Sequence, residues 1–214
     1  MEIPILKEKP KTMIGIPSMG TVRSELATWL IKYGTHAANR IEIVLNGRPE
    51  HIARNILVET FLKSDCQKLW MIDSDVLPPN NAAQLLFLDH PLIAPVCYYV
   101  DFEGELVSVF DSNLGKVKDH RTLDEFSLVD ATGAGSLIID RSVFERLETP
   151  YFDWATNPEC TKVYRGEDIY FSMNCNEAGI KTLLVRDFVF LHRRLKEMPT
   201  GIDFNMYIMD KRSN

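Results

Sequence analysis

The residues from Lys68 to Asp75 constrain the fold more than any other part of this chain. Four uninterrupted apolar residues, Leu69 to Ile72, lead directly into Asp73 and Asp75. A short apolar run of this kind is typical of a strand buried inside an α/β sheet, and such sheets bind ligands beyond the carboxyl ends of their strands. The sequence therefore predicts a site rich in carboxylate oxygens at a sheet edge, and these ligands suit Mg²⁺ or Mn²⁺.

Strand-like and helix-like segments alternate before this run. The first apolar segment closes at Pro17, and Pro49 suits the start of the second helix. The expected elements are strand 12–16, helix 23–33, strand 41–45, helix 49–63 and strand 69–72. This βαβαβ order predicts a parallel sheet with right-handed crossovers.

The rest of the chain has a less regular pattern. A glycine-containing break at Gly133 to Gly135 precedes a short strand, and Gly179 suits a helix C-cap. The expected elements are helix 78–88, strands 92–99, 105–110, 126–131 and 136–139, helix 142–147, loop 151–165, helix 167–178 and strands 181–186 and 188–191. The predicted fold class is α/β, a single Rossmann-like domain over 12–192 with a mostly parallel central sheet flanked by helices. We expect an N-terminal extension at 1–11 and a C-terminal tail at 193–214.

Composition sets broad limits on function. The 214 residues include 45% hydrophobic and 25% charged residues, as expected for a globular protein, and this length fits one large domain or two small ones. The net charge of −6 argues against a broad basic surface for non-specific nucleic-acid binding, although it leaves room for a local basic groove.

The spacing of the cysteines and the hydropathy of the chain argue against a structural zinc site and against a membrane-spanning segment. The four cysteines, Cys66, Cys97, Cys160 and Cys175, form no C-x-x-C pair, which argues against structural zinc. They are typical of reduced thiols in a cytoplasmic protein, although cysteine usage alone leaves an extracellular chain open. No apolar stretch approaches ~18 residues, so we expect no membrane span.

Two acidic motifs have both structural and chemical interpretations. Asp73 and Asp75 could form an ordinary Asx-turn before Pro78. If the strand continues, both carboxylates share one face; if it bends at Ser74, one faces a metal and the other a ribose hydroxyl. Glu167 and Asp168 could be simple helix-start charges. Metal-assisted group transfer also needs a second acidic centre that acts as general base.

Other candidates are single residues. His192 follows an apolar strand, and although most lone histidines are structural, this position suits a metal ligand that would favour Mn²⁺. Arg54 lies either on a solvated helix face or against a nucleotide. Gly133 to Gly135 allow close backbone approach to a ligand. Trp154 is equally consistent with a core anchor and with a stacking surface for a sugar.

Taken in order, these motifs resemble the GT-A glycosyltransferases, especially the family-2-like inverting enzymes. The resemblance covers about residues 12–192: the βαβαβ unit leading to D-x-D, a glycine turn, an aromatic loop, G-E-D on a helix and a strand that ends in His. It implies a GT-A fold and a hexosyltransferase-like enzyme. The donor would be a nucleotide-diphosphate sugar and the cofactor Mn²⁺ or Mg²⁺.

The resemblance also implies a role for each matching residue. Asp75 and His192 would bind the metal, with Asp73 near the metal or the ribose, and Asp168 would be the catalytic base beside Glu167. The donor would contact a set of residues near the sheet edge: Pro17, Arg54, Asp73, Ser74, Gly133 and Gly135. Trp154 and Arg165 would contact the acceptor.

One departure from the family bears on whether the enzyme adds one sugar or many. The Q-x-x-R-W motif of processive polymer synthases is absent, which favours transfer of a single sugar. The compact chain is also similar to phage enzymes that glycosylate hydroxymethylpyrimidines in DNA, which would act in the host cytoplasm. The acceptor therefore stays open among a modified DNA base, a small molecule and a glycan. A rim of cations could contact phosphates: Lys162, Arg165, Arg193 and Arg194.

Three other functions compete with this one. A haloacid-dehalogenase-like phosphohydrolase would use D-x-D-x-[TV], but that motif normally follows the first strand and here the fifth position is Leu77. A nucleotidyltransferase would need a glycine-rich basic loop near the first strand, and residues 16–20 fit one poorly. A non-catalytic nucleotide-sugar-binding module would leave buried carboxylates unused, at a desolvation cost.

Overall fold

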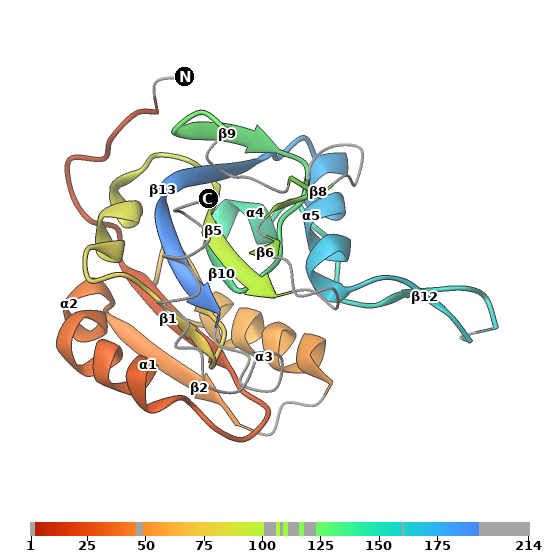
Figure 1. Ribbon diagram of the computed structural model, residues 1–214, viewed down its shortest axis with the longest axis horizontal. Coiled ribbons are helices and arrows are strands. Elements are labelled where there is room, and N and C mark those ends of the chain that lie inside the picture. Colours follow the sequence, from red (N-terminus) through yellow and green to blue (C-terminus); the bar gives the residue numbers. More distant parts are fainter. Residues whose placement is uncertain are drawn as a thin grey trace.

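The computed structural model describes residues 3–45, 49–100, 106–107, 109–110, 116–117, 123–159 and 161–192 (Figure 1). The predicted βαβαβ unit is present as β1 (Thr12–Pro17), α1 (Ser24–Trp29), β2 (Arg40–Val44), α3 (Glu50–Leu62) and β3 (Lys68–Ile72). The first helix continues through η1 (Leu30–Gly34), a π-helical turn, and α2 (Thr35–Ala37). Strand β1 pairs in parallel with both β2 and β3, as predicted.

The second half completes the sheet. Its elements are β4 (Val76–Leu77), η2 (Ala82–Phe87), β5 (Leu92–Val100), β6 (Leu106–Val107), β7 (Val109–Phe110), β8 (Lys116–Val117), β9 (Phe126–Val129), β10 (Ser136–Asp140), α4 (Arg141–Phe144), β11 (Ala155–Thr156), β12 (Val163–Arg165), α5 (Glu167–Glu177) and β13 (Thr182–His192). Within the described residues the main sheet has the order β2-β1-β3-β10-β5-β13-β4, with β6 beside β5 and β9 beside β13.

The sheet is mixed: its first three strands are parallel, as the βαβαβ order predicted, and antiparallel pairs follow. Strand β10 runs antiparallel to both of its neighbours, β3 and β5, whereas β13 runs parallel to β5. The two strands predicted after the last helix are one strand, β13, with an irregularity between Val185 and Val189. The predicted loop 151–165 contains the small hairpin β11–β12.

The core lies on both faces of the sheet. Alternating residues of β3 point to opposite sides, so Leu69 and Met71 pack under α3, α4 and α5, while Trp70 and Ile72 pack against α1 and η2. The rings of Trp70 and Trp29 pack edge to face, with their centroids 5.7 Å apart. The indole N–H of Trp70 donates to Ser136 Oγ at 3.0 Å. This packing fixes the position of β3, whose end carries the acidic motif.

The N-terminal segment is joined to the body of the protein by a short β-bridge. Ile5 forms a β-bridge with Leu88, so this segment lies along η2. The described cysteines, Cys66, Cys97 and Cys175, are unpaired, and Cys160 lies outside the described residues. Across the part of the chain that the structure describes, no helix has both the length and the apolar character needed to cross a membrane.

Candidate functional site

A tight turn after β3 positions the two aspartates. The Asp73 N–H donates to the carbonyl of Gly135 at 3.0 Å, and the Val76 N–H donates back to the Asp73 carbonyl at 3.0 Å. The chain then enters β4. The strand therefore bends at this motif, yet a carboxylate oxygen of Asp73 and one of Asp75 still lie within 4.8 Å of each other and of a ring nitrogen of His192.

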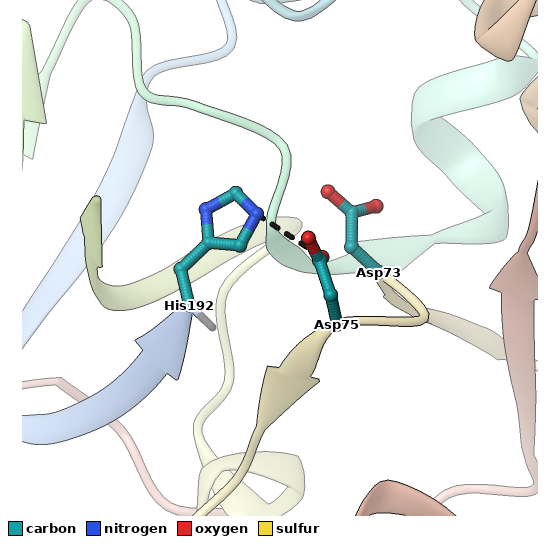
Figure 2. Close-up of side chains that lie close together, drawn as sticks. All are labelled: Asp73, Asp75 and His192. Atoms are coloured by element: carbon teal, nitrogen blue, oxygen red, sulfur yellow. Dashed lines mark ion pairs between the residues drawn. The ribbon is translucent and has the colours of Figure 1, made fainter. Parts of the chain in front are cut away.

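His192 reaches the turn because the end of β13 pairs with β4. In this antiparallel pair His192 lies opposite Val76, which directly follows Asp75. His192 Nε2 lies 3.1 Å from Asp75 Oδ1 (Figure 2). The structure thus brings together the three residues that the sequence predicted as metal ligands. Two carboxylates and one imidazole at this spacing are a donor set suited to Mn²⁺ or a similar ion.

Arg54 lies inside the protein, with an exposed fraction of only 2%. Its Nη2 lies 2.9 Å from Asp73 Oδ1 and 3.4 Å from Glu50 Oε1, and its Nε lies 3.7 Å from Glu167 Oε1. Its Nη1 donates to the Ala134 carbonyl at 3.3 Å. A nucleotide contact for Arg54 stays a prediction; the structure shows that Arg54 links α3 to the acidic turn, the glycine turn and α5.

Charge and burial oppose each other around Arg54. Burial alone would lower the pKa of the guanidinium, but Asp73, Glu50 and Glu167 together raise it above its ordinary value. Burial raises the pKa of Asp73 to about 7, and the nearby Arg54 opposes that rise. Asp73 Oδ1 is buried, and its partner is the guanidinium of Arg54, whose Nη2 lies 2.9 Å away.

Asp168 forms the second acidic centre, on the first turn of α5. Burial raises the pKa of its carboxyl, and the Ile169 N–H, which donates to Asp168 Oδ1 at 2.8 Å, and Arg54 oppose that rise. Two glycines leave room beside it: a Cβ on Gly166 would lie 2.9 Å from Asp168 Oδ1, and one on Gly133 would lie 3.7 Å from Oδ2. The carboxylate therefore sits against bare backbone, where a substrate can approach closely.

The aromatic loop is attached to α3 by Asn55. The Asn55 amide donates to the Phe152 carbonyl at 2.8 Å and accepts from the Phe152 N–H at 3.2 Å. Phe152 is buried and stacks on Phe171 of α5, with ring centroids 4.4 Å apart. Trp154, two residues on, is 39% exposed and lies next to Gly166. Trp154 is thus an exposed ring near Asp168, and Phe152 is the core anchor.

The other predicted residues occupy the same edge of the sheet or its border. Pro17 ends β1, and continuing the β1–β3 register places it level with Asp73. The Ser74 carbonyl accepts from the Arg23 N–H at 3.1 Å, and Gly135 holds Asp73 as described above. Arg165 is exposed at the end of β12. The proposed cations Arg193 and Arg194 lie outside the described residues.

A pocket of about 420 Å³ opens near the start of α1. It lies between the run α1–η1 and the segment from Leu77 to Asn80, and its walls include Trp29 and Tyr33. Small-molecule pockets commonly enclose about 300–1,000 Å³. A ligand placed there would touch Leu77, two residues after Asp75.

Sequence reasoning missed two residues of this site. Glu50 pairs with the buried Arg54, and the i, i+4 spacing on a predicted helix was the available signal. Gly166 was noted only as part of a motif, and its importance depends on how closely Asp168 folds back over it.

Comparisons with known proteins give a fold but no family. No protein-family model matches the chain, and neither does any curated protein. The solved structure of A197 from STIV is similar, with a TM-score of 0.61, 21% identity and coverage of 86% of this chain and 85% of that one. A crystal structure of GalNAc-T7 with UDP, GalNAc and Mn²⁺ is also similar, with a TM-score of 0.60 and 15% identity. That match covers 92% of this chain but only 46% of the other, so the chain spans less than half of its length. These likenesses show a GT-A-like fold.

Proposed function

We propose that this protein is a metal-dependent glycosyltransferase that moves one sugar from a nucleotide-diphosphate sugar to an acceptor hydroxyl with inversion. The observation that carries the proposal is the grouping of Asp73, Asp75 and His192 within 4.8 Å at the end of β3. The GT-A-like fold supports it, as does the presence of UDP, GalNAc and Mn²⁺ in the similar GalNAc-T7 structure.

The residues at this turn fit a divalent cation. Asp75, Asp73 and His192 would hold it, and the imidazole favours Mn²⁺ over Mg²⁺. When bound, such a metal supplies positive charge that neutralises the diphosphate leaving group. Arg54 keeps the Asp73 carboxylate in place through their 2.9 Å ion pair.

Asp168 is proposed as the general base. It would take the proton of the acceptor hydroxyl while that oxygen attacks the anomeric carbon from the side opposite the leaving diphosphate, which inverts the centre. Its raised pKa, caused by burial, brings its basicity closer to working pH. Glu167 stays within the Arg54 network and would position the start of α5.

The surrounding residues would orient the two substrates. Gly133 and Gly135 allow the donor sugar to approach the backbone, and Pro17 and Ser74 border the nucleotide. Trp154 offers an exposed ring to the acceptor beside Asp168, and Arg165 pairs with Ala155, the residue that follows Trp154. A sugar acceptor would stack on Trp154.

A thermal-shift panel tests this proposal. Nucleotide diphosphates and nucleotide sugars are each added with and without Mn²⁺, because a ligand that binds only the folded state raises the midpoint. We expect one nucleotide class to give a metal-dependent shift that Asp75→Ala and His192→Ala abolish. Asp89→Ala, which removes an exposed acid elsewhere, should keep the full shift.

The other outcomes separate the alternatives. Metal-dependent hydrolysis of a simple phosphoester, without any shift by nucleotides, would replace the proposal with a phosphohydrolase. A clear nucleotide-sugar shift without transfer to any member of a broad acceptor panel would favour a binding module.

A further inference from the structure

Strand β2 forms one end of the main sheet. Among the described residues it pairs only with β1, so its other edge presents backbone N–H and C=O groups to solvent. Ile43 on this strand is 44% exposed, and Leu45, just beyond it, is 57% exposed. Proteins usually protect such edges with charge, proline or bulges, because an open apolar edge pairs readily with another strand.

Helix α3 adds apolar side chains on the same side. Arg54 reaches the end of β3, so that flank of α3 faces the interior of the sheet. Ile52 and Ile56 lie one turn apart on the side of the helix opposite Arg54, and are 42% and 41% exposed. Figure 1 shows β2 at the rim of the molecule, with α1 and α3 on either side of it.

The exposed apolar groups lie on both faces of this edge. Ile41 packs against the core cluster that contains α1, whereas Val44 packs against the cluster that contains α3. Because side chains alternate along a strand, Ile43 points to the α1 face, and Ile52 and Ile56 lie over the α3 face. A second strand added at β2 would therefore find apolar contacts above and below the new pair.

Charge identifies the partner strand. Arg40 and Glu42 share the α3 face of β2 and form an ion pair at 2.5 Å. Consider two β2 strands paired antiparallel so that Ile41 lies opposite the partner's Ile41. Arg40 then lies opposite the partner's Glu42, and Glu42 lies opposite the partner's Arg40. Shifting this register by one residue in each strand would place Glu42 opposite the partner's Glu42, which is destabilising.

We propose that the β2 edge joins two copies of this chain into a two-fold symmetric dimer with a continuous sheet. The surface is self-complementary, as a two-fold interface requires, because each copy supplies both the cation and the anion. The two Arg40–Glu42 contacts set the register, Ile41 lies opposite the partner's Ile41, and Ile43 lies diagonally across from that residue on the same face.

Charge-swapped variants test the dimer by sedimentation or light scattering. The wild type should show, with rising concentration, a mass twice that of the 24.5 kDa chain. Arg40→Glu and Glu42→Arg each place like charges opposite one another, and each should weaken the dimer by about tenfold or more. An equimolar mixture of the two variants should restore a heterodimer, which also shows that both variants are folded.

An apolar substitution provides the matched comparison. Ile43→Lys should yield a monomer, whereas Ile5→Lys, at an exposed isoleucine beside η2, should leave the dimer intact. A wild type that stays monomeric at all concentrations would overturn the proposal. A dimer that survives Ile43→Lys and both charge swaps would overturn it as well, because the interface would then lie elsewhere.

Discussion

At the scale of single residues, burial gives Asp168 its chemical character. Its carboxyl lies against Gly133 and Gly166 and accepts one backbone hydrogen bond, from Ile169. Desolvation raises the pKa of this group above that of an ordinary aspartate. A carboxylate of this kind is a stronger base than an exposed one, and it also destabilises the folded state when it is ionised.

Asp168→Asn should separate these two consequences. Under the proposed mechanism the variant loses its base, so turnover should fall by about 10²-fold or more. Donor binding in the thermal-shift assay should persist. Glu177→Gln, at the other end of α5, is the control and should keep full turnover. Near-normal turnover of Asp168→Asn would remove Asp168 from the role of base.

The same substitution has an expected pH signature in stability. Because the folded-state pKa of Asp168 is raised, the folded protein binds this proton more tightly than the unfolded chain, and stability is lost as pH rises through the folded-state pKa. Asparagine does not ionise. Urea denaturation should therefore show Asp168→Asn gaining stability relative to wild type at pH 7 but not at pH 4. An equal difference at both pH values would contradict the assigned cause.

At the scale of elements, α3 organises the site from two of its residues. One turn of this helix supplies Arg54 to the acidic centres and Asn55 to the aromatic loop. The loop has little regular structure of its own before β11, so the paired hydrogen bonds between Asn55 and Phe152 take the place of a strand pairing. Through them α3 sets the position of Trp154 relative to Asp168.

Asn55→Ala should therefore destabilise the protein and move the loop. It leaves the N–H and C=O of Phe152 without these partners in a partly buried position, at a cost of about 1–3 kcal/mol. Chemical denaturation measures the loss, with Glu59→Gln on the exposed side of the same helix as the control. Under the proposed function the KM for the acceptor should rise while donor binding stays unchanged. An effect no larger than that of the control would show that the loop is held by other contacts.

At the scale of the whole molecule, Arg54 connects parts that are distant in sequence. It contacts carboxylates from α3, from the turn after β3 and from α5, and the backbone of the glycine turn before β10. Removing the guanidinium would leave Asp73 and Glu167 buried without their cation. Breaking a buried ion pair from one side typically costs about 3–5 kcal/mol.

Arg54→Met should thus lower the free energy of unfolding by about 3–5 kcal/mol. Arg54→Lys should retain part of the lost free energy of unfolding but not all of it, because a single ammonium cannot reach the several acceptors that the planar guanidinium contacts. The loss should be smaller at pH 5 than at pH 8, since protonation of the buried carboxyls removes the uncompensated charge, and burial already raises the pKa of Asp73 to about 7. Equal losses at both pH values in urea titrations would argue that Arg54 acts through packing alone.

The sequence by itself determined the first half of the fold and the identity of the acidic groups. The alternation of apolar segments predicted β1, β2 and β3 and their parallel pairing, because each signal is local and repeats within a few residues. The D-x-D and G-E-D motifs marked the two acidic centres. The residues themselves predicted a metal site at the two aspartates and a ligand role for His192, and the family resemblance singled out Asp75 as the expected metal ligand.

The tertiary structure decided what those groups face. The pairing of β13 with β4 places His192 at 3.1 Å from Asp75, and the insertion of β10 between β3 and β5 makes the sheet mixed. The helical period placed Arg54 on α3 but could not say which flank would face the end of β3. These outcomes depend on contacts between segments far apart in the chain, which form only when both faces of the sheet are buried together, so no short stretch of sequence contains them.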